Sequence, residues 1–147
     1  MDCLISRKHI GMLFKGINKG IVCVLNKEFE AFGITLMQYE VLHYLYCHEG
    51  KCEINQKDIE KFFNSTNPTI TGILNRLQAK NLISREASTE DARYKVITLT
   101  EEGEKIIYET SKVGPDKMEK RLTKNLTNEE REQLRSLLAK VLEGLEG

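Results

Sequence analysis

Residues 65–76 determine the fold that we expect, and they read Ser65-Thr66-Asn67-Pro68-Thr69-Ile70-Thr71-Gly72-Ile73-Leu74-Asn75-Arg76. The apolar residues of this stretch recur at three- and four-residue steps, which predicts a helix from Thr66 to Lys80 with one buried face. Pro68 is tolerated because it lies in the first turn. The other positions carry small hydrogen-bonding side chains. Such side chains either cap and solvate the helix or contact a partner.

Upstream of this stretch, the spacing of apolar residues predicts helices over 6–32, 36–48 and 55–63. Thr35 and Gln38 have the spacing of a capping box at the start of the second helix. Asn55 is suited to cap the third helix, with Asp58 accepting from the free amides. Gly33 and Gly50 are suited to end the first and second helices.

Downstream, residues 82–86 and 94–99 are predicted strands around a polar turn, 87–93. Asn81 suits the left-handed conformation that ends the preceding helix. A helix from Thr100 is expected to run past Lys112, with Gly114-Pro115 as a kink or break. The Thr127 to Glu130 segment has the form of a second capping box, which opens a final helix to about residue 145.

This order of elements predicts a mainly α fold with a small β-hairpin (α+β). Two adjacent helices followed by a hairpin form a winged helix-turn-helix, placed at 34–101. Residues 6–33 and 102–147 supply flanking helices whose apolar faces are too large to stand alone in water. We expect these faces to pack together and against a second copy, within one compact chain.

The composition limits the classes of function. The 147 residues include 22 basic and 22 acidic ones and are 40% hydrophobic, typical of a soluble globular protein. No apolar run is long enough to span a bilayer, and no signal peptide is recognisable, so we expect a cytoplasmic protein without membrane contact. The cysteines at 3, 23, 47 and 52 are expected to be reduced and mostly buried. Because phosphate loops, nucleophile elbows and carboxylate pairs are absent, we expect neither an enzyme nor a cofactor.

Double-stranded DNA is the partner that the polar residues around 65–76 favour. In helix-turn-helix proteins the start of the second helix enters the major groove, where Asn can recognise adenine and Arg can recognise guanine. A winged helix that binds another protein is the alternative, but its corresponding face is typically apolar or acidic. The predicted DNA-contacting residues are Ser65, Thr66, Asn67, Pro68, Thr69, Thr71, Asn75, Arg76, Arg93 and Lys95.

The hairpin tip strengthens the DNA hypothesis. Arg93 is suited to a narrow minor groove, where the negative potential is deepest. Asp91 is predicted to support the wing by holding the arginine fork with charge-assisted hydrogen bonds. The alternative is a solvated turn with an ordinary surface ion pair. Between residues 64 and 100 there are five basic and three acidic residues, so the local positive charge is modest.

Three segments resemble the MarR family of transcription regulators. Ile34-Thr35-Leu36-Met37-Gln38-Tyr39 resembles the L-T-x-x-Q-Y opening of that family's second helix. Its recognition helix and the following strand resemble three further runs of this chain, Pro68-Thr69-Ile70-Thr71, Asn75-Arg76-Leu77 and Lys80-Asn81-Leu82-Ile83. Asp91-Ala92-Arg93 with Leu99-Thr100-Glu101-Glu102-Gly103 matches its wing signature D-x-R-x5-L-T-x-x-G. The resemblance covers residues 34–103.

The resemblance implies a homodimer that binds a pseudo-palindromic operator, with a recognition helix in each major groove and Arg93 in the neighbouring minor groove. It also implies a regulator, by default a repressor, that a small molecule releases from DNA. Two departures are Gly72, where a longer and often basic residue is common, and Asn81, which replaces a common glycine.

Small, often aromatic or anionic, effectors of the family bind between the dimerisation and DNA-binding parts. The candidate lining in this chain is His9, Met12, Lys15, Tyr39 and His43. A metal- or thiol-responsive regulator is an alternative. His43 and Cys47 lie four residues apart on one helix face, which suits a metal, although a buried thiol beside a satisfied histidine is the simpler interpretation. The family's peroxide-sensing cysteine aligns near Gly11, which disfavours a thiol switch.

Overall fold

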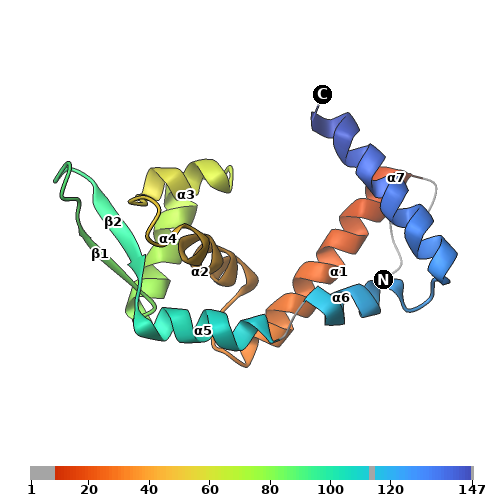
Figure 1. The fold of residues 1–147 in the computed structure, drawn as a ribbon, viewed down its shortest axis with the longest axis horizontal. Coiled ribbons are helices and arrows are strands. Elements are labelled where there is room, and N and C mark those ends of the chain that lie inside the picture. Colours follow the sequence, from red (N-terminus) through yellow and green to blue (C-terminus); the bar gives the residue numbers. More distant parts are fainter. Residues whose placement is uncertain (1–8, 113–114, 147) are drawn as a thin grey trace. The chain divides into compact units, whose positions relative to one another are not determined.

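The computed structural model describes residues 9–112 and 115–146 (Figure 1). The chain divides into two compact units, residues 1–113 and 114–147. The first unit contains helices α1 (Ile10–Glu30), α2 (Leu36–His48), α3 (Gln56–Phe62), α4 (Asn67–Ala79) and α5 (Glu101–Ser111), with strands β1 (Ile83–Ala87) and β2 (Lys95–Leu99) between α4 and α5. The second unit contains α6 (Pro115–Thr123) and α7 (Asn128–Glu146). The predicted mainly α fold with a β-hairpin is confirmed.

Side-chain caps define where several helices begin. Thr35 Oγ1 accepts from the Gln38 amide at 3.2 Å, and Gln38 Oε1 accepts from the Thr35 amide at 3.2 Å. Asn55 and Asp58 make the same reciprocal pair at α3. Thr127 and Glu130 make it at α7, with distances of 2.8 and 3.2 Å. The three predicted caps are therefore confirmed, and each satisfies amides that a helix start leaves free.

The hairpin continues directly from the end of α4. Asn81 has a φ of +57°, the left-handed conformation expected from its sequence position. β1 and β2 then pair antiparallel, with Ile83 opposite Leu99 and Ala87 opposite Lys95. The Ile97 amide of β2 also donates to the Ile54 carbonyl at 2.8 Å. The wing is thus attached to the segment between α2 and α3.

The core of the first unit lies where α2, α3, α4, the hairpin and α5 meet (Figure 1). Its fully buried side chains come mainly from α2 and α4, with Ile59 of α3 and Ile83 of β1 between them. Each such aliphatic side chain contributes roughly 1.5–3 kcal/mol by leaving water. Phe29 and Tyr39 stack with their ring centroids 4.6 Å apart, which joins the end of α1 to this core.

Several expectations are wrong in detail. The helix predicted to run past Lys112 ends at Ser111, with Lys112 as its cap; Val113 and Gly114 lie outside the described residues. Cys23, Cys47 and Cys52 are exposed rather than buried, because they lie on outward positions of α1, of α2 and of the following loop. Cys3 lies outside the described residues.

The apolar rows on the flanking helices are exposed within each unit. In α1, Ile10 is 70% and Ile17 51% exposed, although a hydrophobic row predicts burial. In α7, Leu142 is 61% exposed. Among the helices of the described residues, none is both long and apolar enough to cross a bilayer.

Gly103 allows α5 to pack against the turn between α4 and β1. Thr100 donates to the Asn81 carbonyl at 2.6 Å and caps α5 by accepting from the Gly103 amide at 3.1 Å. A Cβ atom on Gly103 would overlap the carbonyl oxygen of Leu82 and lie 3.1 Å from Leu99 Cδ2. A backbone carbonyl cannot rotate away as a flexible side chain does, so this glycine is required by close approach.

We predict that Gly103→Ala lowers the free energy of unfolding by about 1–3 kcal/mol, because the methyl group forces α5 away from the Leu82 carbonyl. Chemical denaturation measures the change. Gly72→Ala is the control, since nothing lies within 4 Å of a Cβ there. It should be neutral or stabilising by up to roughly 1 kcal/mol, because alanine favours helix. Equal stability of Gly103→Ala and wild type would contradict the packing argument.

Candidate nucleic-acid interface

Helix α4 presents most of the predicted DNA-contacting side chains to solvent. Ile70, Leu74 and Leu77 are fully buried, and this fixes the rotation of the helix about its axis. The opposite positions therefore point outward. The exposed ones are Thr66, Asn67, Pro68, Thr69, Asn75 and Arg76, whereas Ser65 and Thr71 are half-buried.

Two residues of α3 that sequence reasoning missed bind the start of α4. Gln56 Nε2 donates to Thr71 Oγ1 at 2.7 Å and to Glu60 Oε1 at 3.0 Å. Asn67 Nδ2 donates to the same Glu60 oxygen at 2.8 Å. The four-residue spacing of Gln56 and Glu60 indicated a shared helix face, but only the packing of α3 on α4 identifies what that face contacts.

Asn75 is also held by a neighbouring element. Arg85 of β1 donates from Nη2 to Asn75 Oδ1 at 2.7 Å. Partial burial lowers the pKa of the Arg85 guanidinium, and its Nε atom has no hydrogen-bond partner among the described residues. Asn75, which was predicted to contact a base, therefore already accepts a hydrogen bond from Arg85 through its side-chain oxygen. From the sequence, Arg85 was counted only toward the local charge.

The wing tip contains the predicted clamp. Arg93 donates to Asp91 from Nη2 at 2.7 Å and from Nε at 3.0 and 3.1 Å, and its amide also donates to Asp91 Oδ1. The hydrogen bonds from the Arg93 side chain and amide lower the pKa of the Asp91 carboxyl, and Asp91 raises the pKa of Arg93. The Arg93 side chain is nevertheless 84% exposed. The Arg93 guanidinium is therefore held in one orientation by Asp91 and is still accessible to solvent.

The turn of the wing is anchored by Glu53, another residue that the sequence analysis did not single out. Its two carboxylate oxygens accept from Ser88 at 2.6 Å and from Thr89 at 3.2 Å. Lys57 of α3 lies 5.6 Å from the ring centroid of Tyr94, so it adds a positive charge beside the wing. Lys95, predicted to contact DNA, is exposed at the start of β2.

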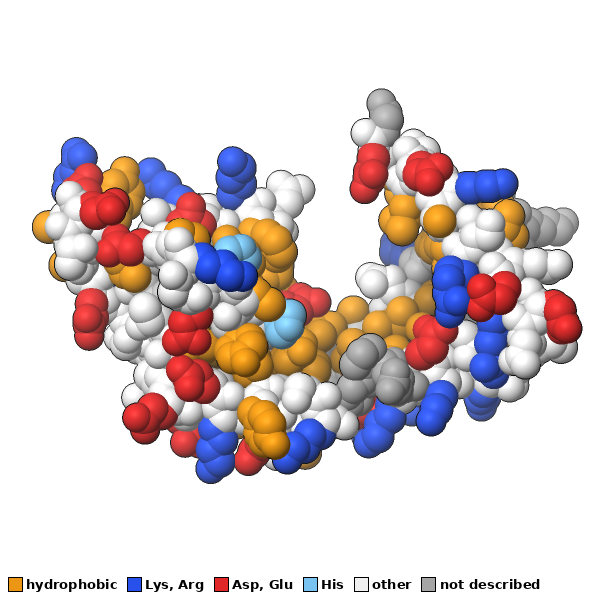
Figure 2. Space-filling model, viewed as in Figure 1, with side chains coloured by type: hydrophobic (Ala, Val, Ile, Leu, Met, Phe, Trp, Pro, Cys, Tyr) orange, Lys and Arg blue, Asp and Glu red, His pale blue; other side chains and the backbone are white. Residues whose placement is uncertain are grey.

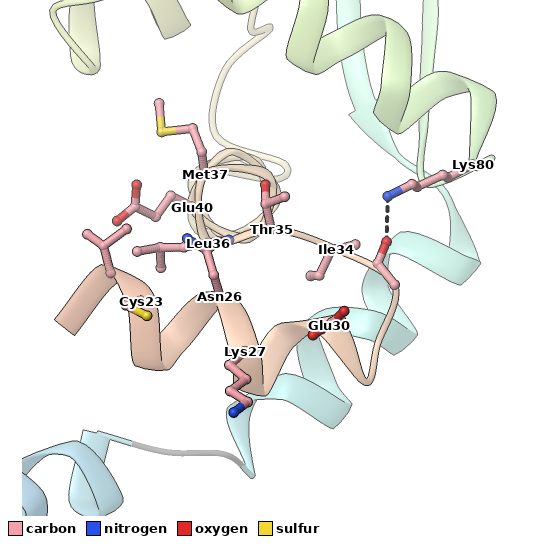
Figure 3. Close-up of a pocket in the computed structure, with 12 residues that line it drawn as sticks. Cys23, Asn26, Lys27, Glu30, Ile34, Thr35, Leu36, Met37, Glu40 and Lys80 are labelled. Carbon is pink, nitrogen blue, oxygen red and sulfur yellow. Dashed lines mark hydrogen bonds between the residues drawn. The ribbon is translucent and has the colours of Figure 1, made fainter. Parts of the chain in front are cut away.

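Lys80 joins the end of α4 to the loop between α1 and α2. Its Nζ donates to the Gly33 carbonyl (Figure 3). The same Nζ donates to Gln38 Oε1 at 3.1 Å. Asn26 of α1 in turn accepts from the Leu36 amide at 2.8 Å. All of these residues except Gln38 border an open cavity of about 1010 Å³ between α1 and α2, with Cys23, Glu40 and Met37 also in its lining (Figure 3). Burial raises the pKa of the Glu40 carboxyl.

A second cleft, of about 480 Å³, is lined by residues of α2 and α5. It contains Tyr39 and His43 from the predicted effector site. The pKa of Tyr39 is raised, first by burial and then by the nearby Cys47 and Glu40. His9, Met12 and Lys15 line neither cavity described above, so their role stays a prediction. The complete lining is Tyr39, His43, Tyr46, Glu101, Glu104, Lys105, Ile107, Tyr108 and Ser111.

The alternative of a metal site gains no support from the geometry. Cys47 Sγ lies 3.8 Å from the ring nitrogens of His43. Across residues 9–112 and 115–146, however, no group of three or more His, Cys, Asp or Glu side chains is placed to hold a metal ion. Two neighbouring ligands fall short of the four that a structural zinc site uses.

Charge is mixed across the wing and the helices beside it. On the face shown in Figure 2, acidic and basic side chains are interspersed over this region, at the left of the view. Glu53, Glu60 and Asp91 are all used in contacts that orient other side chains. Acidic residues as well as basic ones therefore orient the side chains of the candidate interface.

Comparison with known proteins identifies the family. The MarR family model matches residues 34–95. The chain is 34% identical over 128 residues to the HTH-type transcriptional regulator YdgJ of Bacillus subtilis, covering 86% of this chain and 73% of YdgJ. Among solved structures, S. aureus MepR in complex with DNA has 33% identity and a TM-score of 0.76, covering 95% of this chain and 99% of MepR.

The reduced form of MarR from E. coli has 30% identity and a TM-score of 0.79, covering 91% of this chain and 96% of that one. These matches extend beyond the winged helix to the flanking helices. The predicted resemblance is therefore confirmed: the chain belongs to the MarR family and is a winged helix-turn-helix transcription regulator, not an enzyme.

Proposed function

We propose that the protein binds a pseudo-palindromic operator in double-stranded DNA as a homodimer and represses transcription until a small molecule releases it. We expect this action in the cytoplasm, where DNA-binding regulators of the MarR family act. The proposal rests on four features: the wing arginine, the exposed face of α4, the apolar rows of the flanking helices, and the cleft between α2 and α5.

The observation that carries the proposal is the state of Arg93. A mobile surface arginine loses side-chain entropy when it binds, whereas this one is already held by Asp91. Its exposed guanidinium suits the negative potential of a narrow minor groove. Asp91 neutralises part of the charge, so the pair favours shape-dependent contact over indiscriminate attraction to phosphate.

Helix α4 would then occupy the adjacent major groove. Its outward face carries amide and hydroxyl groups with Arg76, a composition that favours base edges and phosphates over an apolar protein partner. Gly72 lies on this face with open space around it, so the backbone can approach the DNA closely. These features favour DNA over the alternative of a protein-interaction module.

Dimerisation would cover the exposed apolar rows. Ile10 and Ile17 of α1, and Leu137 and Leu142 of α7, are each more than half exposed within their own units. Rows of this size are rarely left in water. A two-fold dimer also places two winged helices on the half-sites of an inverted repeat, about one helical turn apart.

The cleft between α2 and α5 is the proposed effector site. Its volume falls in the usual range for small ligands. Tyr39, Tyr46 and Tyr108 line it, and Glu101 and Glu104 outnumber Lys105 among its charged residues. This chemistry favours an aromatic cation, whereas the effectors of the family are often aromatic or anionic. A ligand here would separate α5 from α2, and α5 supports the wing through Gly103.

Arg93→Ala should weaken operator binding at least about tenfold, because each subunit loses a minor-groove contact. Fluorescence anisotropy with a duplex selected by the wild type measures the loss. The melting temperature should not change, since Arg93 is exposed. Arg135→Ala is a matched control, because Arg135 also forms an exposed ion pair at 2.7 Å. Full affinity in Arg93→Ala would show that the wing does not contact DNA.

Leu142→Glu should dissociate the dimer, because it places a charge in an apolar contact. Sedimentation equilibrium should give a monomer, with operator binding lost and the winged helix still folded by circular dichroism. Phe62→Glu serves for comparison: Phe62 is 62% exposed on α3, outside the proposed contact, and its substitution should leave a dimer. A dimeric Leu142→Glu would remove α7 from the proposed interface.

Tetraphenylphosphonium should release the operator complex, whereas tetraphenylborate, of the same shape and opposite charge, should not. Glu104→Gln should weaken tetraphenylphosphonium binding roughly fivefold, measured by calorimetry, because it removes a carboxylate that faces the cation. Glu143→Gln, an exposed glutamate of α7, should bind it as the wild type does. Stronger binding of the borate would reverse the assignment of ligand charge.

A further inference from the structure

We infer that Glu60 and Gln56 of α3 set the base preference of the recognition helix by fixing the side-chain amide of Asn67. The inference rests on the proposed function and deepens it. Neither residue is assigned a contact with DNA. Both act through Asn67 and Thr71, and are therefore positioning residues.

The contacts form a closed ring. Gln56 Nε2 donates to Glu60 Oε1 at 3.0 Å and to Thr71 Oγ1 at 2.7 Å. Asn67 Nδ2 donates to the same Glu60 oxygen at 2.8 Å. Thr71 Oγ1 closes the ring by donating to Asn67 Oδ1, more weakly at 3.4 Å. Two residues of α3 thus hold two residues of α4 that lie one turn apart.

The chemistry of Glu60 selects the orientation of the Asn67 amide. An ionised carboxylate only accepts hydrogen bonds, so it must face the amide nitrogen and not the amide oxygen. The oxygen then lies on the side where the Thr71 hydroxyl donates. A glutamine in place of Glu60 would impose no such choice, because either end of its own amide can face Asn67.

The fixed amide still has capacity to contact a base. Asn67 is exposed, and its nitrogen keeps a second hydrogen while its oxygen keeps a second lone pair. Adenine recognition in the major groove requires one donor and one acceptor in a set order. An amide held in that order before binding loses less entropy and does not present the reversed pattern to another base.

Glu60 is expected to lower the overall affinity for DNA, and this effect makes the inference testable. Its negative charge lies beside the α4 face that approaches phosphate, so it weakens binding to every sequence. Its contact with Asn67 strengthens discrimination between sequences. Specificity is a difference of affinities, and a residue that lowers overall binding can therefore raise it.

The experiment is selection of binding duplexes from a random library, followed by sequencing, with wild type, Asn67→Ala, Glu60→Gln and Glu90→Gln. Glu90 is exposed on the wing turn, so Glu90→Gln removes an equal charge near DNA without touching α4. Wild type should enrich adenine at one position of each half-site. Asn67→Ala should abolish that preference alone.

Glu60→Gln should reduce the adenine preference at this same position about tenfold and leave the other positions unchanged. Both glutamate variants should bind a scrambled duplex more tightly than wild type, by similar factors. Gln56→Met keeps the charge of Glu60 but removes the hydrogen bond that Gln56 donates to it. This variant should reduce the adenine preference at the same position to a smaller degree. Melting temperatures confirm that each variant is folded.

An unchanged adenine preference in folded Glu60→Gln and Gln56→Met would overturn the inference, as would equal relaxation in Glu90→Gln. So would an Asn67→Ala protein that keeps the wild-type preference. In each of these outcomes wild-type binding stands. Failure of the wild type to enrich any sequence would instead overturn the proposed function.

Discussion

Burial of one face of α4 is the constraint on which the rest of the interface depends. Ile70, Leu74 and Leu77 have no exposed surface, and together they contribute several kcal/mol of apolar burial. This energy fixes the rotation of the helix, since turning it would expose those side chains. The outward direction of Asn67, Asn75 and Arg76 follows from it. Hydrogen bonds from α3 and β1 then adjust side chains whose general direction the core has already fixed.

Features that depend on neighbours in sequence were predictable. The Thr35–Gln38 and Thr127–Glu130 caps join residues three apart, and the Asp91–Arg93 clamp joins residues two apart. In each case the chemistry and the spacing are sufficient, because the backbone between the partners has one compact solution. The left-handed Asn81 was predictable for the same reason.

Contacts between distant residues were not predictable from one sequence. Glu53 and Ser88 are 35 positions apart, and Lys80 and Gly33 are 47 apart. Nothing local distinguishes Glu53 or Glu60 from other surface glutamates. The burial predicted for cysteine failed for a related reason. Residue type gives an average preference, whereas the exposure of Cys23 and Cys47 depends on which side of a helix each occupies.

The same packing suggests how the parts communicate. Helix α2 contacts α1 through the Asn26 bond to the Leu36 amide, and α4 through the Lys80 bond to Gln38. Helix α5 supports the turn before the wing, where Gly103 meets the Leu82 carbonyl. A ligand at the proposed site between α2 and α5 would therefore act on two elements that contact the proposed DNA-binding parts. Because packed interfaces rearrange between discrete states, a small displacement of α5 can change the position of Arg93. Because the chain has zero net charge, we propose that operator binding would depend on this placement more than on general attraction to phosphate.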